Sequence, residues 1–208
     1  MPRPMPPYTA AFQRGVTYAL GLARAGEAAA HSSARSEWQT TRVEYLYELS
    51  FLRIFVEWEI FLEQTFLRYL CGYQSTHGTF APTAGRHCVS LAHAERLIFR
   101  QRGFALWHDP AAVVNRSLQH LISCPHEVIV QSNSARLLHF AAIRHRVVHG
   151  QVDAKLKFDN ATMTISGRRY HASRPGRFLR DWDISAVQAS RWLEVVGLEL
   201  VGMARQIA

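Results

Sequence analysis

The longest regular pattern of apolar and polar positions runs from Glu37 to about Cys71, without a glycine or a proline. Apolar residues recur at helical spacing, and charged residues fill the positions between them. The apolar positions are Trp38, Tyr45, Leu49, Leu52, Phe55, Trp58, Phe61, Leu62, Phe66 and Tyr69. The pattern predicts one helix about 50 Å long, at ~1.5 Å per residue, that Gly72 ends. Because this exceeds the diameter of a small domain, we expect part of the helix to bend or to contact a partner.

Shorter helices are predicted on both sides of this segment from spacing and capping residues. They cover residues 8–30, 86–101, 110–121 and 134–149, and a last helix capped by Asp183 runs to about residue 206. Residues 1–8 hold four prolines, which forbid a helix, so we expect a disordered lead-in there.

The period changes from helical to alternating after the helix at residues 134–149. Leu156 and Phe158 alternate with lysines, and Met163 and Ile165 alternate with threonines. Asp159-Asn160 lies between the two runs, which predicts a β-hairpin at about residues 153–166. The fold class expected is therefore mostly α: an antiparallel helical bundle with a small β-hairpin before the last helix, in a single domain over residues 9–208.

Composition and charge narrow the classes of partner. The 208 residues carry a formal net charge of +8, which favours polyanions through long-range attraction, although a basic protein without such a partner has the same balance. The apolar stretch at residues 195–204 is too short to span a bilayer and contains Glu199, so no membrane is expected. No phosphate-binding glycine loop is present, which argues against a nucleotide hydrolase or a dinucleotide enzyme.

The three cysteines, Cys71, Cys88 and Cys124, form no C-x-x-C pair. An odd number without paired spacing indicates reduced, buried thiols, and together with the absence of a signal peptide it predicts a soluble cytoplasmic protein.

The candidate chemistry lies at the end of the helix predicted at residues 134–149. Gly150 is expected to take the left-handed conformation that closes a helix, and the negative end of the helix dipole favours a protonated His149. Arg144 precedes His149 by five residues, or about 7.5 Å of rise and about 140° of rotation on an ideal helix. A long guanidinium arm could reach that point, so a fixed cation and a proton-transfer group would meet. RNA cleavage needs this combination.

Simpler interpretations of the same residues stay open. A histidine beside a glycine at a helix end often only caps a carbonyl, and an arginine on a helix is usually a solvated charge. His145 and His149 also have the spacing of metal ligands, but only Asp153 is nearby as a third ligand, so we expect no metal and no cofactor.

The string Arg144-His145-Arg146-Val147-Val148-His149-Gly150 resembles the R-x(4–6)-H motif of HEPN domains, the helical family named for higher eukaryotic and prokaryotic nucleotide-binding proteins. A polar residue commonly follows the arginine in that family, and His145 fits. Glu59, within residues 51–70, resembles the glutamate on the early helix of bacterial HEPN families. The similarity covers roughly residues 40–205, and the motif matches lie at residues 53–70 and 141–150.

This resemblance implies a helical bundle that forms a homodimer with the two motifs facing each other. It implies a metal-independent endoribonuclease that leaves a 2′,3′-cyclic phosphate, acting as a toxin or in defence against phage, with a cognate antitoxin or defence-system protein as a further partner. His149 would then be the acid or base, Arg144 would bind the phosphate, and His145 and Glu59 would assist. The alternative is a non-catalytic module of the same fold that binds RNA, a nucleotide or a partner protein, because a fold does not fix its chemistry.

An irregular loop at residues 168–180 is rich in arginine and contains no acidic residue. Tyr170, His171 and Phe178 are interleaved with the cations, so aromatic faces could stack on bases while guanidinium groups hold phosphates. The predicted RNA-binding residues are Arg146, Arg168, Arg169, Arg174 and Arg177. The alternative is a solvated loop whose arginines, Arg180 included, pair with Asp181 and Asp183.

Overall fold

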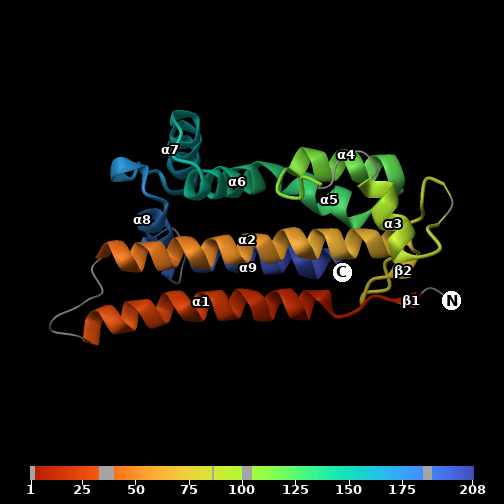
Figure 1. Cartoon of the computed structure of the whole chain (residues 1–208), viewed down its shortest axis with the longest axis horizontal. Helices are drawn as coiled ribbons and strands as arrows, with labels where there is room; N and C mark the ends of the chain where they lie inside the picture. The colour runs from red at the N-terminus through yellow and green to blue at the C-terminus, as the bar shows by residue number, and fades with distance from the viewer. Residues whose placement is uncertain (1–2, 33–39, 86, 100–104, 185–188) are drawn as a thin grey trace. The chain divides into compact units, whose positions relative to one another are not determined.

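The computed structural model describes residues 3–32, 40–85, 87–99, 105–184 and 189–208, and these are mostly helical, as predicted (Figure 1). The longer helices are α1 (Tyr8–Ser32), α2 (Thr40–Leu70), α4 (Pro110–His120), α6 (Ser134–Val148), α7 (Val152–Ser166) and α9 (Trp192–Ile207). The shorter ones are α3 (Leu91–Ile98), α5 (Pro125–Ser132), α8 (Pro175–Arg180) and the 3-10 turn η1 (His171–Ser173). Among the described residues, no helix combines the length and the apolarity needed to cross a membrane.

The chain divides into two compact units, each assembled from separate segments. The terminal unit contains both chain ends and consists of Met1–Phe12, Trp58–Leu137 and Val201–Ala208. The motif unit consists of Gln13–Glu57 and Leu138–Leu200 and carries the end of α6. The expectation of one domain over residues 9–208 stays a prediction.

The long helix predicted from the apolar pattern is present as α2, and Gly72 follows it with a φ of 75°. Residues 37–39 of the predicted range lie outside the described residues. Phe55, Trp58 and Phe66 are fully buried, as the pattern predicted, but Tyr45 and Leu49 are 60% and 62% exposed. The helical period was therefore right along α2, while the face that is buried near its N-terminus differs from the one that the pattern selected.

The β-hairpin predicted at residues 153–166 is wrong, because these residues form helix α7. Ala154, Phe158, Ala161 and Thr162 are its buried residues and share one helical face, whereas Leu156 and Met163 are exposed. Gly167 ends the helix in the left-handed conformation (φ 67°) and donates its N–H to the Met163 carbonyl. The alternation of apolar residues with lysine and threonine thus reflected an amphipathic helix with a narrow, small-residue face.

A small strand pair does precede the last helix, as the fold class predicted, but it lies elsewhere. Strand β3 (Trp182–Asp183) pairs antiparallel with β4 (Ser190–Arg191), and α9 follows directly. Asp183 is therefore part of a strand and does not cap the last helix. Residues 175–180, expected to be irregular, form α8 with Pro175 at its first position, where the missing N–H costs nothing.

The expected disordered lead-in is ordered from residue 3 onward in the terminal unit. Strand β1 (Arg3–Pro4) pairs in parallel with β2 (Tyr73–Gln74), and the side chain of Met5 is buried. The four prolines do exclude a helix, but an edge strand tolerates them because it needs few N–H donors. Helix α5 was not predicted; Pro125 at its first position marks its start.

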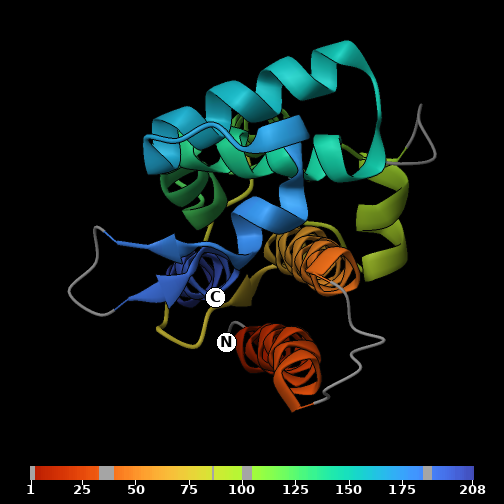
Figure 2. The same cartoon turned by 90° about the vertical axis from the view of Figure 1, so that its left-hand side faces the viewer.

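In the motif unit, helices α1, α2 and α9 lie side by side, and α6, α7 and α8 lie on the side of α2 opposite to α1 (Figures 1 and 2). Small residues allow the close approach: Gly26 faces Leu46, and Gly197 faces Val16 and Ile54. Phe178 on α8 stacks on Trp192, with ring centroids 5.4 Å apart, and meets Tyr170 and Phe158 edge-on. Because this aromatic cluster is buried, it fixes α8 and the turn before it.

The terminal unit has a second aromatic core around α2, with Phe66 against Trp107 and Tyr69 donating to the Ile207 carbonyl at 2.6 Å. His126 on α5 is completely buried in this core. Its Nε2 lies 2.9 Å from Thr65 Oγ1 and 3.2 Å from the Leu62 carbonyl oxygen, and its Nδ1 lies 3.4 Å from Cys124 Sγ. Since a carbonyl only accepts, Nε2 carries the proton and Nδ1 accepts from the thiol.

Candidate functional site

Helix α6 carries the R-x(4–6)-H string to its C-terminus, where it ends at Val148. Gly150 is not among the glycines with positive φ, so the predicted left-handed closure is wrong, and the last turn is instead held by the His149 N–H on the His145 carbonyl at 2.9 Å. The rings of His145 and His149 lie one turn apart, with centroids 4.6 Å apart. His149 is exposed, which leaves its imidazole accessible to a ligand.

The arginine that shares a side of α6 with His149 is Arg146, and not Arg144. Three residues correspond to about 300° on an ideal helix, or 60° from the same face, whereas five residues leave about 140°. Arg146 donates from Nε to the Ser173 carbonyl at 3.1 Å and from Nη1 to the His149 carbonyl at 3.4 Å. The i, i+3 spacing of Arg146 and His149 was visible in the sequence and is the signal that identifies this pair.

A cavity of about 260 Å³, here called the motif cavity, lies at this helix end within the motif unit. Among the residues that line it are Glu44, Tyr45, Glu48, Arg146, His149, Ser173 and Arg174. Arg144 and His145 are not among them. The structure therefore brings His149 together with Arg146 and Arg174 from the predicted set, and adds two carboxylates, Glu44 and Glu48, that no sequence pattern indicated.

Glu44 and Glu48 lie one turn apart on α2 and differ in their surroundings. Glu44 is buried and its Oε2 lies 2.5 Å from Arg174 Nη2. Glu48 is half-buried and accepts the Gly176 N–H on Oε1 at 2.8 Å. Burial raises the pKa of Glu48 above its ordinary value, and repulsion from Glu44 adds to this, while the Gly176 hydrogen bond, Arg174 and Arg146 act in the opposite direction. One carboxylate of the cavity is thus engaged in an ion pair, and the other has a raised pKa.

A tight turn positions Arg174 between these groups. Ala172 and Ser173 both adopt the left-handed region, with φ of 56° and 47°, which is costly for residues with a Cβ. Three contacts hold the turn: Ser173 N–H on the Tyr170 carbonyl, Ser173 Oγ on Asp159 Oδ1 at 2.7 Å, and Arg146 on the Ser173 carbonyl. Such stored strain is common where a side chain must be held in a fixed place.

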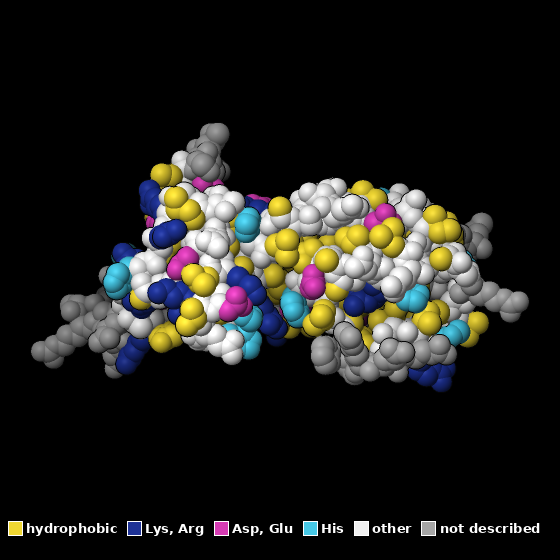
Figure 3. All heavy atoms as spheres, turned by 90° about the horizontal axis from the view of Figure 1, so that it is seen from above, with side chains coloured by type: hydrophobic (Ala, Val, Ile, Leu, Met, Phe, Trp, Pro, Cys, Tyr) yellow, Lys and Arg dark blue, Asp and Glu magenta, His cyan; other side chains and the backbone are white. Residues whose placement is uncertain are grey.

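A second cavity of about 740 Å³, here called the arginine cavity, shares Glu44 and Arg174 with the first. Its arginines are Arg168, Arg169, Arg174, Arg177, Arg180 and Arg191, and its carboxylates are Glu44 and Asp181. Lysine and arginine side chains gather over the motif unit in the space-filling view (Figure 3). Four of the predicted RNA-binding residues therefore lie in one cavity, and its charge is strongly positive.

Part of this positive charge is compensated by ion pairs, as the alternative interpretation of the loop expected. Arg168 lies 3.4 Å from Asp181, and Arg180 and Arg191 lie 2.6 Å and 3.6 Å from Glu27. Asp183, the other expected partner, is buried in β3. Within the part of the chain that the structure describes, Arg169 and Arg177 have no carboxylate within ion-pair distance, and both are exposed. These two arginines are the cations most available to an added anion.

The aromatic residues of this segment have mostly structural roles. Phe178 is fully buried, so the expectation that it stacks on bases is wrong. Tyr170 is also buried and donates its hydroxyl to Asp181 at 2.9 Å. Tyr170 and His171 both line the arginine cavity, and His171 is the exposed one of the two.

His145 and Glu59 differ from His149 in their surroundings. Desolvation lowers the pKa of His145, and His149, Lys157 and Arg144 lower it further against the effect of Asp153. The net shift favours the neutral form of its ring. Glu59 belongs to the terminal unit, where its Oε2 lies 3.9 Å from His108 Nδ1. The motif cavity and the arginine cavity are both confined to the motif unit.

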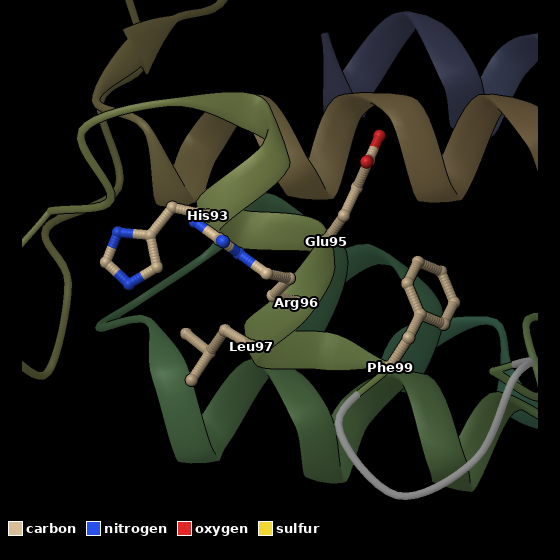
Figure 4. A pocket seen from close by; sticks show the side chains of 5 residues that line it. All are labelled: His93, Glu95, Arg96, Leu97 and Phe99. Carbon is tan, nitrogen blue, oxygen red and sulfur yellow. The ribbon is translucent and has the colours of Figure 1, made fainter.

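Other features of the described residues offer less chemistry. A cavity beside α3 is lined by His93, Glu95, Arg96, Leu97 and Phe99, whose side chains point in different directions from one short segment (Figure 4). No group of three or more His, Cys, Asp or Glu side chains in the described part of the chain is arranged to hold a metal ion. The cysteines are free thiols, with Cys88 and Cys124 buried.

Comparison with protein-family models, with curated proteins and with solved structures found no match. The resemblance to HEPN domains therefore rests on the residues of the motif, and the site must be judged by its own geometry.

Proposed function

We propose that this protein is a metal-independent endoribonuclease of HEPN type that cleaves RNA by attack of a 2′-hydroxyl on the adjacent phosphate. The observation that carries the proposal is that His149 and Arg174 line one cavity, and that Arg174 also lines the arginine cavity. A proton-transfer group thus lies beside a surface suited to a polyanion, which is the combination that phosphodiester cleavage requires.

In this proposal the guanidinium groups divide into two sets. Arg146 and Arg174 hold the oxygens of the phosphate that is cut, because they line the motif cavity with His149. Arg146 uses Nε–H and one Nη1–H on backbone carbonyls, and a guanidinium has further donors for a phosphate oxygen. Arg168, Arg169 and Arg177 hold the neighbouring phosphates of the strand.

We propose that the active form is a homodimer, in which Arg144 and His145 act next to the motif of the second copy. The support is an exposed apolar stripe on α2 at helical spacing, formed by Tyr45, Leu49 and Val56, with Tyr45 also lining the motif cavity. Light scattering at micromolar concentration tests this part, since a monomer that still cleaves RNA would contradict it. A cytoplasmic toxin or defence effector, held by an antitoxin or a defence-system protein, is the biological role we propose.

The experiment is cleavage of a defined RNA by purified protein in EDTA. The wild-type protein should release products with a 2′,3′-cyclic phosphate and a 5′-hydroxyl, and His149→Ala and Arg144→Ala should lose this activity. His93→Ala is the matched control, because His93 is an exposed histidine on α3 in the terminal unit. Cleavage that requires a divalent metal, or that survives both substitutions, would sink the proposal.

A non-catalytic module that binds RNA, a nucleotide or a partner protein is the second candidate. It is favoured by the two exposed arginines without a carboxylate partner among the described residues, since their binding surface does not depend on His149. On this alternative, His149→Ala retains RNA binding and no products appear at high protein concentration. A growth defect on expression that His149→Ala relieves would instead favour the enzyme.

A further inference from the structure

The proposed cleavage needs two proton transfers, and the motif supplies one histidine to the cavity. A base must remove the proton from the 2′-hydroxyl, and an acid must give a proton to the 5′-oxygen that leaves. His145 does not line the motif cavity. The reaction therefore requires a second titratable group that faces the motif cavity.

We infer that Glu48 is the second proton-transfer group of this cavity: it acts as the base on the 2′-hydroxyl, with His149 as the acid on the 5′-oxygen, both within one chain. This inference rests on the proposed ribonuclease function. It differs from a site in which the two copies of a dimer supply the acid and the base to one another.

The placement of Glu48 supports this role. The residue lines the cavity together with His149, and it is half-buried, so one edge of the carboxylate can meet a ligand. Its Oε1 is held by the Gly176 N–H at 2.8 Å, and Oε2 has no hydrogen bond to a described residue. A carboxylate that is anchored by one oxygen presents the other in a fixed direction, as a general base requires.

The groups around Glu48 keep it distinct from Glu44. On its own helix Glu44 is engaged by Arg174 at 2.5 Å, which commits that carboxylate to an ion pair. Arg174, from the turn before α8, and Arg146, from α6, also lie near enough to Glu48 to lower its pKa, against burial and Glu44, which raise it. The net direction of the pKa shift is upward, so the Glu48 carboxylate is a better proton acceptor than an ordinary glutamate.

The bonds balance without a further reactant. Glu48 accepts the proton of the 2′-hydroxyl, the 2′-oxygen bonds to phosphorus, and the bond from phosphorus to the 5′-oxygen breaks. His149 gives its proton to that oxygen. The products are a 2′,3′-cyclic phosphate and a 5′-hydroxyl, and the two side chains exchange protons with water before the next cycle.

The first test is Glu48→Gln, which keeps an oxygen for the Gly176 N–H and removes only the titration. We expect kcat to fall by about 10²- to 10⁴-fold, the range for loss of a general base, with little change in KM. The acid limb of the kcat/KM profile should also disappear. Glu57→Gln is the matched control, since Glu57 is a glutamate of α2 that pairs with Arg53 in the same unit. Wild-type rates within threefold for Glu48→Gln would overturn the inference.

The second test separates the acid from the base. In an RNA analogue whose 5′-oxygen at the cleavage site is replaced by sulfur, the leaving thiolate needs no proton. His149→Ala should then regain most of the wild-type rate, and Glu48→Gln should not. The opposite pattern of rescue would overturn the assignment.

The activity of the wild-type protein distinguishes a failure of the proposed ribonuclease function from a failure of the role of Glu48. Wild-type protein that cuts no RNA defeats the proposed function itself, whereas active wild-type protein with an equally active Glu48→Gln defeats only the role of Glu48. Should Glu48→Gln fail to unfold cooperatively, Glu48→Asp replaces it. That variant withdraws the carboxylate by one methylene, so kcat should fall at least tenfold while the acid limb remains, and an unchanged kcat would overturn the inference.

Discussion

Gly176 packs directly on the backbone of Glu44, so that a Cβ at position 176 would overlap the Glu44 carbonyl group. The same glycine donates its N–H to Glu48. The start of α8 is therefore fixed against α2 by a contact that only glycine permits, and this contact places Arg174, two residues earlier, beside Glu44.

The first prediction concerns this contact. Gly176→Ala should destabilise the protein by about 2–3 kcal/mol, because the methyl group must displace the backbone of α2 or α8. Urea unfolding measures the change. The control is Gly21→Ala in the middle of α1, where nothing lies within 4 Å of the added Cβ; it should stabilise by roughly 0.5–1 kcal/mol through helix propensity. A Gly176→Ala protein as stable as the wild type would show that α8 is not held in this way.

The second prediction is a dependence of stability on pH that His126 causes. Burial is the main reason that the pKa of His126 is lowered from 6.5 to about 3, so the folded state excludes a proton that the unfolded state binds. This difference in proton binding does not affect stability above pH 6.5, and it destabilises the folded state increasingly as the pH falls toward 3. Between pH 6.5 and pH 3, protonation of His126 in the unfolded state should lower the free energy of unfolding by up to about 1.4 kcal/mol per pH unit.

Urea unfolding of the wild type and of His126→Gln between pH 4 and pH 7 measures that contribution. The variant should be less stable at pH 7, because it loses the contacts to Thr65 and Cys124, but its stability should fall less steeply in acid. His93→Gln, which replaces an exposed histidine, should keep the wild-type slope. Parallel slopes for wild type and His126→Gln would refute the assignment.

The third prediction is that Arg169 and Arg177 contribute to RNA binding through charge. Replacing both by glutamine should weaken binding to single-stranded RNA across sequences and reduce the slope of log affinity against log salt by about 0.7 for each phosphate that is no longer neutralised. Binding titrations at several salt concentrations measure this. Arg53→Gln, which removes an exposed arginine outside the arginine cavity, should have a smaller effect. Equal effects of these substitutions would mean that binding follows net charge alone.

The sequence predicted α2 and the end of α6 because both depend on local spacing, and it placed His149 at an exposed helix end. The sequence pattern did not predict helix α7, because Ala154 and Thr162 supply half of its buried face without a large apolar side chain. It also missed Glu48. The position of Glu48 in the cavity depends on Arg146 and on the turn before α8, about a hundred residues or more along the chain, and no local pattern carries that information.

The most direct test of the central claim is the cleavage of a 5′-labelled RNA in EDTA by wild-type protein and by His149→Ala. The account predicts fragments with 2′,3′-cyclic phosphate ends from the wild type, and a loss of at least a hundredfold, by the usual weight of general acid–base catalysis at about 10²–10⁴, for the variant. Equal cleavage by both proteins, or cleavage by neither, would contradict it.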